Sequence, residues 1–392
     1  SAVRENAQMR FPWLYAEIWK FYGDLCAEFA LWDTANAAYR RAIRLYPRNE
    51  LRLQLASLAT RSGDLSLAEE QLLEVAGGGE ELRRDAFMQL ARIELQRQRQ
   101  LPQRRRNWAA VKRAIENAAQ NGAPDDFLNA MTVEALLAEG RIDDAAQLLS
   151  DALDQDQTSP LLWRQFAALK LQQGDSEAGW DAVKKYRDLA QDRSSAVLFE
   201  AQMLVNAART DEAVSMLQNE LKREHQAAGQ LAQLYIALAQ IHLRQRDTAA
   251  AFKTLSAAHE RLPHDSHIAD EAAQLAWLSQ NWRQLGQHVG WLREIEGPSG
   301  TLWRAYQVQL LLARLTTETD SRYAEALAHT QFIGEQRPNW PKTHFLRGEL
   351  ALVRGEQDAA LVSYLRAWEL GSRNMLLADR IIDIYSRTNC GG

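Results

Sequence analysis

Cysteine, glycine and proline are all scarce in this chain of 392 residues. The two cysteines, Cys26 and Cys390, lie near opposite ends, so neither a disulfide framework nor a cysteine metal motif is predicted. With 20 Gly and 9 Pro the chain has too few turn residues for an all-β fold, which needs a turn about every 8–12 residues. No apolar run approaches the ~20 residues of a membrane span.

The chain also lacks a strong charge of either sign. It has 46 Lys and Arg against 51 Asp and Glu, a net charge of −5, which disfavours nucleic acid and anionic lipid as partners of the whole surface. The sequence starts at Ser1 without an initiator Met or a secretory signal pattern. We therefore expect a fragment of a longer protein, soluble in the cytoplasm or the periplasm, with no compartment favoured and any targeting segment missing.

What the chain does contain is helix-forming sequence from end to end, with a repeat. Leu, Ala, Gln, Glu and Arg dominate, and Val and Ile do not alternate with polar residues. A small residue recurs at a period of about 36 residues. Its ten occurrences are Ala35, Ala68, Ala110, Ala145, Gly179, Ala213, Ala251, Gly286, Ala326 and Ala360.

The residues around each small residue indicate a pair of helices. Gly63, Gly140, Gly174 and Gly355 each stand five residues before one, where a left-handed glycine would end the first helix. The small residue itself would lie where the second helix crosses the first. Pro47, Pro263, Pro298 and Pro338 each stand twelve residues after one and would end the second helix, because proline cannot continue it.

This pattern resembles the tetratricopeptide repeat family, whose unit is a helix–turn–helix of about 34 residues. Two repeats match best. They are the first (Trp19, Gly23, Ala35, Tyr39, Ala42 and Pro47) and the last (Gly348, Gly355, Ala360, Tyr364 and Ala367). The resemblance implies an all-α fold, a right-handed superhelix of about ten repeats.

The domain organisation follows from the same repeat. We expect one continuous solenoid over 1–388, including a capping helix at 374–388, and a disordered tail at 389–392. Two long steps between anchors put extra residues near 98–107 and 314–322, and there the local register is the least certain.

No catalytic, cofactor or metal motif is found. The chain has no phosphate-binding loop, no nucleophile elbow and no zinc-protease motif. His259, His264 and His267 cluster, but their spacing favours an inter-helix turn over a zinc site. The sequence therefore predicts a protein that is not an enzyme and that needs no cofactor.

A basic run is the one local charge feature. It consists of Arg104, Arg105, Arg106, Lys112 and Arg113 around Trp108. We interpret it first as a solvated loop, next as a contact for an acidic protein, and last as a contact for nucleic acid or anionic lipid.

In a stacked solenoid the first helices line a concave groove, which suits an extended peptide or a partner helix. Stepping along each first helix gives the predicted groove residues Lys20, Asp24, Glu134, Arg164, Gln202, Gln240, Glu271, Phe345 and Glu349, with apolar Leu198, Ile236 and Leu275 beside them.

The predicted function is a non-enzymatic scaffold that binds a protein or peptide in this groove. The alternative is the repeat arm of a larger enzyme, such as a glycosyl- or sulfotransferase, or of a bacterial secretion or envelope assembly. A weaker alternative is a nucleic-acid contact through the loop at Arg104–Arg106. The sequence does not identify the partner or the oligomeric state.

Overall fold

The computed structural model describes residues 11–28, 31–223, 227–315, 317, 320–372 and 374–389. Within this part of the chain every regular element is a helix and no strand is present, which confirms the all-α prediction. The chain divides into two compact units, residues 1–246 and residues 247–392.

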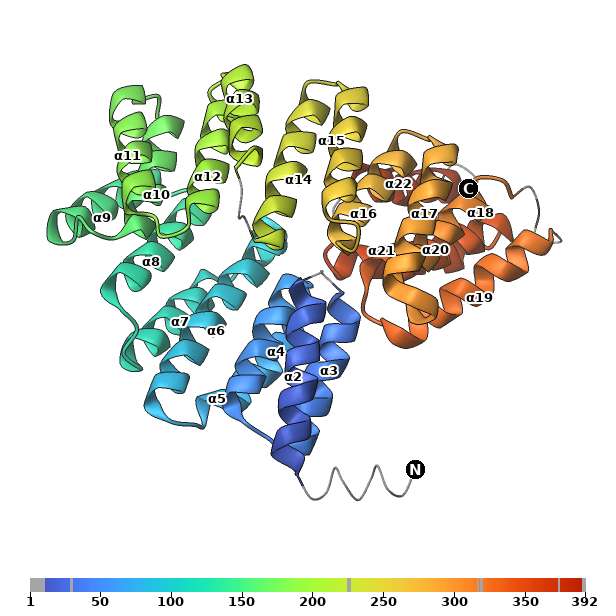
Figure 1. Ribbon diagram of the computed structural model, residues 1–392, viewed down its shortest axis with the longest axis horizontal. Helices are drawn as coiled ribbons and strands as arrows, with labels where there is room; N and C mark the ends of the chain where they lie inside the picture. Colours follow the sequence, from blue (N-terminus) through green and yellow to red (C-terminus); the bar gives the residue numbers. More distant parts are fainter. Residues whose placement is uncertain are drawn as a thin grey trace. The chain divides into compact units, whose positions relative to one another are not determined.

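Unit 1 is a series of helix hairpins that follow one another along the chain (Figure 1). The six hairpins are α2 (Pro12–Glu28) with α3 (Trp32–Leu45), α4 (Asn49–Arg61) with α5 (Leu65–Ala76), α6 (Glu80–Gln100) with α7 (Trp108–Gln120), α8 (Asp125–Glu139) with α9 (Ile142–Gln155), α10 (Pro160–Gln172) with α11 (Ser176–Leu189), and α12 (Arg193–Asn206) with α13 (Thr210–Leu221). The last helix of the unit is α14 (Ala228–Arg244). A short 3-10 helix, η1 (Gln103–Arg105), lies between α6 and α7.

Unit 2 begins with α15 (Thr248–Arg261) and continues with three hairpins. They are α16 (Ser266–Leu278) with α17 (Trp282–Glu296), α18 (Leu302–Leu312) with α19 (Ser321–Gln336), and α20 (Pro341–Val353) with α21 (Gln357–Glu369). The 3-10 helix η2 (Gly297–Ser299) precedes α18, and α22 (Met375–Asn389) lies where the terminal helix was expected. The residues predicted as a disordered tail lie outside the described part, except Asn389. The single domain and the handedness of the superhelix stay predictions.

The predicted small residues lie in the helix crossings. Six alanines of the series are completely buried on the second helices of hairpins within one unit, namely Ala35, Ala68, Ala145, Ala213, Ala326 and Ala360. Ala251 is also completely buried, on α15. Gly179 is also buried, and a Cβ there would lie 2.6 Å from the Leu171 side chain. Real Cβ contacts are longer than this, so only glycine fits between α10 and α11 at that point.

Two of the ten predicted anchors are wrong by one residue. In the third repeat the buried position is Val111 and not Ala110, and in the eighth it is Leu285 and not Gly286. A Cβ on Gly286 would meet only Leu310, at 3.8 Å. In these two hairpins a larger side chain, Val111 or Leu285, fills the crossing. Because the pattern required a small residue, it assigned the anchor to the adjacent Ala110 or Gly286.

Seven of the described turns before second helices contain a left-handed residue. Gly63, Gly140, Gly174 and Gly355 have φ between 74° and 86°, as predicted. Three further repeats place a residue with a side chain in the same conformation, which are Ala208 (φ 59°), Arg246 (φ 62°) and Gln280 (φ 54°). Gln280 stands five residues before Leu285, which independently supports the corrected register of that repeat.

We expect Ala208→Gly and Gln280→Gly each to raise the stability of the chain by about 0.5–1 kcal/mol. The left-handed conformation costs a residue with a Cβ about 1–2 kcal/mol, and the added freedom of glycine in the unfolded chain offsets part of the gain. Urea unfolding measures both changes. The matched control is Gly140→Ala, which has room for the methyl group but should lose stability; a gain there would contradict this account of the turns.

A buried histidine lies in the core of unit 2. His288 on α17 is 3% exposed, and its ring lies 4.4 Å from the Trp291 ring and is stacked on Phe252 of α15. Neither ring nitrogen has a hydrogen-bond partner among the described residues. Burial, aided by the nearby His259, lowers the pKa of His288 to about 4.

We therefore expect unit 2 to lose stability as the pH falls from 6.5, the ordinary histidine pKa, towards 4. Across this range the unfolded chain takes up a proton at His288 that the folded chain resists, and the loss approaches about 3 kcal/mol. Thermal unfolding of His288→Leu should show a shallower acid dependence than the parent chain. His264→Gln, in an exposed turn, is the control and should follow the parent; equal slopes for all three would rule out His288 as the cause.

Candidate functional site

The predicted groove residues of unit 1 that remain exposed lie on three successive first helices. Arg164 on α10, Gln202 on α12 and Gln240 on α14 are exposed. Gln202 donates to Asn206 Oδ1 of its own helix at 2.8 Å. Between these polar groups, Leu198 is half-buried and Ile236 is buried. Arg164, Gln202 and Gln240 therefore form a strip of exposed polar side chains, and the apolar side chains between them are mostly buried.

Two other predicted residues of unit 1 have partners within the chain. Glu134 on α8 pairs with Arg99 of α6 at 3.0 Å and accepts a hydrogen bond from Gln165 of α10 at 3.3 Å. This carboxylate thus links three successive first helices. Asp24 pairs with Lys20 at 2.6 Å and accepts a hydrogen bond from the Tyr39 hydroxyl of α3. Glu134 therefore links neighbouring hairpins, and Asp24, which Lys20 pairs with on the same helix, links the two helices of the first hairpin.

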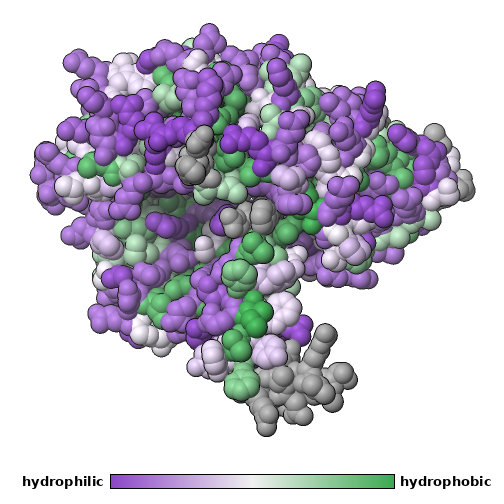
Figure 2. All heavy atoms as spheres, viewed as in Figure 1, coloured by the Kyte–Doolittle hydropathy of each residue, from purple (hydrophilic) through white to green (hydrophobic). Residues whose placement is uncertain are grey.

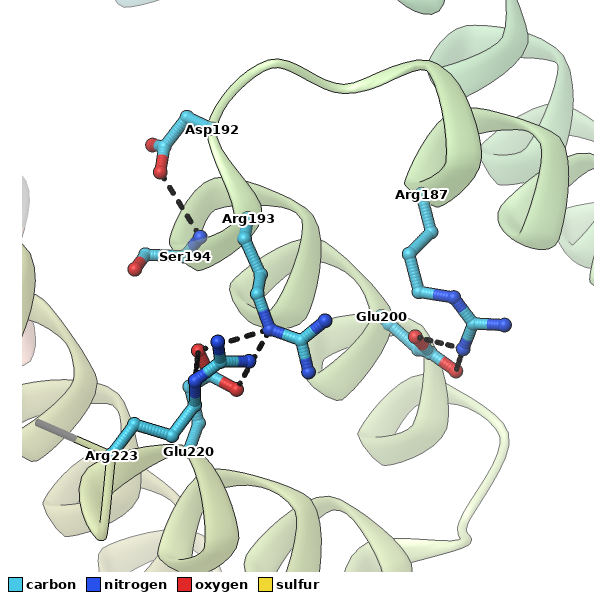
Figure 3. A network of polar contacts seen from close by, with 7 residues as sticks. All are labelled: Arg187, Asp192, Arg193, Ser194, Glu200, Glu220 and Arg223. Atoms are coloured by element: carbon cyan, nitrogen blue, oxygen red, sulfur yellow. Dashed lines mark hydrogen bonds and ion pairs between the residues drawn. The ribbon is translucent and has the colours of Figure 1, made fainter.

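Polar contacts also fix α12, which carries Leu198 and Gln202. Figure 3 shows Arg187 of α11 reaching Glu200 of α12, with nitrogen–oxygen distances of 3.1 and 3.2 Å. At the start of α12, Arg193 donates to Glu220 of α13 at 3.2 Å. Asp192 accepts the Ser194 amide at 3.0 Å as the helix cap. The helix is therefore tied to both neighbouring second helices, which holds its outer face in place.

In unit 2 the structure places two predicted groove residues inside. Phe345 of α20 is buried, and its ring packs edge-to-face on Trp277 of α16 at 6.2 Å. Glu349 accepts the Tyr364 hydroxyl at 2.6 Å and pairs with Arg380 of α22 at 2.8 Å. Both side chains serve packing between helices, so they are poor candidates for contact with a partner.

The corrected register of the eighth repeat also affects Glu271, the remaining predicted groove residue of unit 2. With Leu285 as the anchor, the position equivalent to Gln202 and Gln240 is Gln274. The predicted residues Glu271 and Leu275 each lie one residue beyond the equivalent positions, Asp270 and Gln274, and Leu275 is buried. Half-buried Glu271 faces His267 of its own helix at 3.9 Å, and burial raises its pKa.

A ladder that the sequence analysis missed crosses three first helices of unit 2. Asp270 of α16 accepts the Tyr306 hydroxyl of α18 at 2.6 Å. The Lys342 ammonium of α20 lies 3.6 Å from the centroid of the Tyr306 ring. Burial raises the pKa of Tyr306 and lowers the pKa of Lys342. The three residues are one repeat apart in the sequence, at 270, 306 and 342, and this equal spacing could have revealed them.

The basic run lies on η1 and the first turns of α7. Arg104, Arg105, Lys112 and Arg113 are exposed. Arg106 differs, because its guanidinium donates to the Leu101 carbonyl at 2.9 Å and lies 5.9 Å from the Trp108 ring centroid. Arg106 thus closes the loop, which agrees with the interpretation as a solvated loop, while the partner alternatives stay predictions.

Helix α2 exposes a long apolar face. Ile18, Tyr22 and Leu25 are 54%, 44% and 42% exposed, and the space-filling view shows a line of hydrophobic side chains along this helix (Figure 2). Leu14 and Phe21 extend the same exposed face, and Trp13 in the first turn is exposed as well. One repeat later, at the equivalent positions of α4, Leu51, Leu55 and Leu58 are at most 3% exposed. The α2 face thus has the composition of a core face.

The described residues offer little for chemistry on a small molecule. A cavity of about 430 Å³ between α11, α12 and α13 is open to solvent, and its lining includes Trp180, Glu200, Arg209 and Glu212. Arg209 pairs with Glu212 at 2.7 Å and stacks on Trp180, so its charged groups are already partnered. Within the described ranges no cluster of His, Cys, Asp and Glu could hold a metal, and none of the helices there could span a membrane.

Buried small residues, left-handed turns and short helices follow one another at the predicted period in both units. The fold is a tetratricopeptide-like array of helix hairpins.

Comparisons with known proteins add a distant likeness of fold. No family model matches the sequence, and the search of curated proteins finds no match. Among solved structures, the chain is similar to yeast Tom70 at 14% identity, covering 95% of each chain with a TM-score of 0.35. A tetratricopeptide repeat protein from Parabacteroides merdae gives 12% identity, covers 86% of this chain and 98% of its own, and has a TM-score of 0.37. Scores this low carry no functional argument.

Proposed function

We propose that the chain is a non-enzymatic scaffold that binds protein partners on the faces of its helices. The observation that carries this proposal is the exposed apolar face of α2. Contiguous apolar surface of this kind is rare on proteins that act alone and marks sites of association. Its residues have the same place in the repeat as side chains that are buried in the next hairpin.

The repeat itself suggests what would cover α2. In unit 1 each later first helix packs against the second helix of the hairpin before it, as α4 does against α3. A helix in the corresponding place would bury Ile18, Tyr22 and Leu25 together. Burial of each such side chain is worth about 1.5–3 kcal/mol. The proposed ligand of α2 is therefore an amphipathic helix of a partner protein.

The strip of Arg164, Gln202 and Gln240 is the proposed second contact, for an extended peptide or another helix of the partner. Its middle helix, α12, is fixed in place by the Arg187–Glu200 and Arg193–Glu220 pairs. The strip is mostly polar, so it would add specificity to a contact whose affinity comes from apolar burial. The repeat arm of a larger enzyme or assembly, and a nucleic-acid contact at Arg104–Arg106, stay predictions of the sequence.

We expect the double variant Ile18→Glu/Tyr22→Glu to lose a protein that co-purifies with the tagged parent chain from the host cell. Two carboxylates on the face would have to be desolvated on binding, which costs more than the remaining apolar contact supplies. Quantitative mass spectrometry identifies the protein, and titration of the purified pair measures its affinity.

The matched control is Val362→Glu, which places one carboxylate on an exposed apolar position of α21 and should keep the partner. Because all three positions are exposed, the melting temperatures should stay within a few degrees of the parent. A partner bound equally by the α2 variant would contradict the proposed site. If the double variant Gln202→Ala/Gln240→Ala bound the partner with unchanged affinity, the proposed groove contact would be contradicted as well.

A further inference from the structure

A cluster of cationic side chains surrounds one tryptophan in unit 2. Trp303 at the start of α18 is buried, and its indole N–H donates to the Gly297 carbonyl at 3.0 Å. Its backbone amide donates to Glu296 Oε2 at 3.0 Å. These two bonds fix the indole, and Arg293 of α17, Arg304 of α18 and His329 of α19 converge on it.

Arg304 lies between two aromatic rings. Its guanidinium carbon is 4.2 Å from the Trp303 ring centroid and 4.1 Å from that of Phe332 on α19. One guanidinium nitrogen donates to the Gly300 carbonyl at 2.7 Å. Stacking covers the faces of the guanidinium but leaves its in-plane N–H groups able to donate. Among the described residues no carboxylate forms an ion pair with this guanidinium. Its remaining N–H groups, which the two rings hold in position, can therefore donate to a bound ligand.

The two other cations are placed beside it. The guanidinium carbon of exposed Arg293 is 5.3 Å from the Trp303 centroid, and the half-buried His329 ring meets the indole edge-to-face at 5.3 Å. Burial lowers the pKa of Arg304, the charge of Glu296 opposes this shift, and the charge of Arg293 adds to it. Burial, followed by the charge of Arg304, lowers the pKa of His329.

The nearby carboxylates are already engaged. Glu296 accepts backbone amides at the start of α18, including that of Trp303. Glu325 accepts from Gln307 at 3.3 Å, and its carboxylate lies 3.7 Å from His329 Nε2. Glu296 and Glu325 offset part of the positive charge around Trp303, and a bound anion would relieve the remaining repulsion between the three cations.

We propose that Arg293, Arg304 and His329 form a binding site for a phosphate group. Two permanent cations and one imidazole that can gain a proton match the charge of a phosphate, whose second pKa is about 6. A stacked guanidinium supplies paired donors in the geometry that phosphate oxygens accept. Trp303 and Phe332 act as positioning residues, because they hold the Arg304 plane and do not reach the anion themselves.

The site also has a built-in pH dependence. His329 faces Arg293 of α17, Arg304 of α18 and Glu325 of its own helix, and only Glu325 favours its protonation. A bound phosphate would add a second negative neighbour and raise the His329 pKa. Proton uptake at His329 then accompanies binding, so His329 contributes more to the binding of phosphate as the pH falls from 8 to 6, in addition to the change caused by the titration of the phosphate itself.

Isothermal titration of the full chain with inorganic phosphate at constant ionic strength tests the site. We expect one phosphate per chain, and at least tenfold weaker binding in Arg304→Gln and in Arg293→Gln. Arg293 is exposed, so its variant keeps the proposal testable if Arg304→Gln fails to fold. Arg283→Gln, exposed on the same helix α17, is the control and should bind like the parent. His329→Gln should lose the contribution of the imidazole, so its affinity should follow only the titration of the phosphate itself and should favour low pH less than the affinity of the parent does.

A short peptide with one phosphoserine, and its unphosphorylated form, distinguish the sources of the phosphate. Tighter binding of the phosphopeptide than of inorganic phosphate would assign the site to a modified partner, and the reverse order would assign it to a small phosphate. No saturable binding of either ligand, or equal binding by the parent and Arg304→Gln, would overturn the proposal. The site is far along the chain from α2, so this result does not depend on the proposed function.

Discussion

The whole structure depends on how closely two helices approach at the crossing inside each hairpin. Six alanines fill these crossings with no exposed surface, and at Gly179 even a methyl group would meet Leu171 at 2.6 Å. The same closeness appears at Gly348, where a Cβ would lie 2.4 Å from the Tyr364 ring. Because the backbones nearly touch, the residues four and seven positions later point into a shared core, and each hairpin presents its other faces to its neighbours and to solvent.

This construction gives equivalent positions different roles according to what lies next to them. Leu51 and Leu55 are core residues because α3 covers α4, whereas Ile18 and Tyr22 at the same repeat positions are exposed. Polar positions behave in the same way: Gln202 and Gln240 remain exposed, while the corresponding carboxylates of the first and last hairpins accept hydrogen bonds from Tyr39 and Tyr364. In such an array, a helix face that packs on a neighbouring hairpin in one repeat can bind another molecule in a repeat that has no such neighbour.

The repeating backbone features could be predicted from the sequence, whereas the contacts of individual side chains could not. The period, the hairpins and the left-handed glycines follow from small residues and glycine at fixed spacing, and all are present. The anchor of the eighth repeat was wrong by one residue because Leu285 fills a looser crossing beside a glycine, and this error moved the groove position from Gln274 to Leu275. The burial of Phe345 and the ladder from Asp270 to Lys342 depend on contacts between different repeats, which spacing within one repeat does not contain.

Ala213→Leu with amide hydrogen exchange tests the central constraint most directly. Ala213 is completely buried where α13 crosses α12, and the larger side chain should cost about 1–3 kcal/mol by forcing the helices apart. In a linear array the loss of protection should be confined to α12, α13 and the adjacent hairpins. Gln218→Leu, exposed on the same helix, should leave protection unchanged. Unchanged protection in Ala213→Leu, or an equal loss in both variants, would contradict the account.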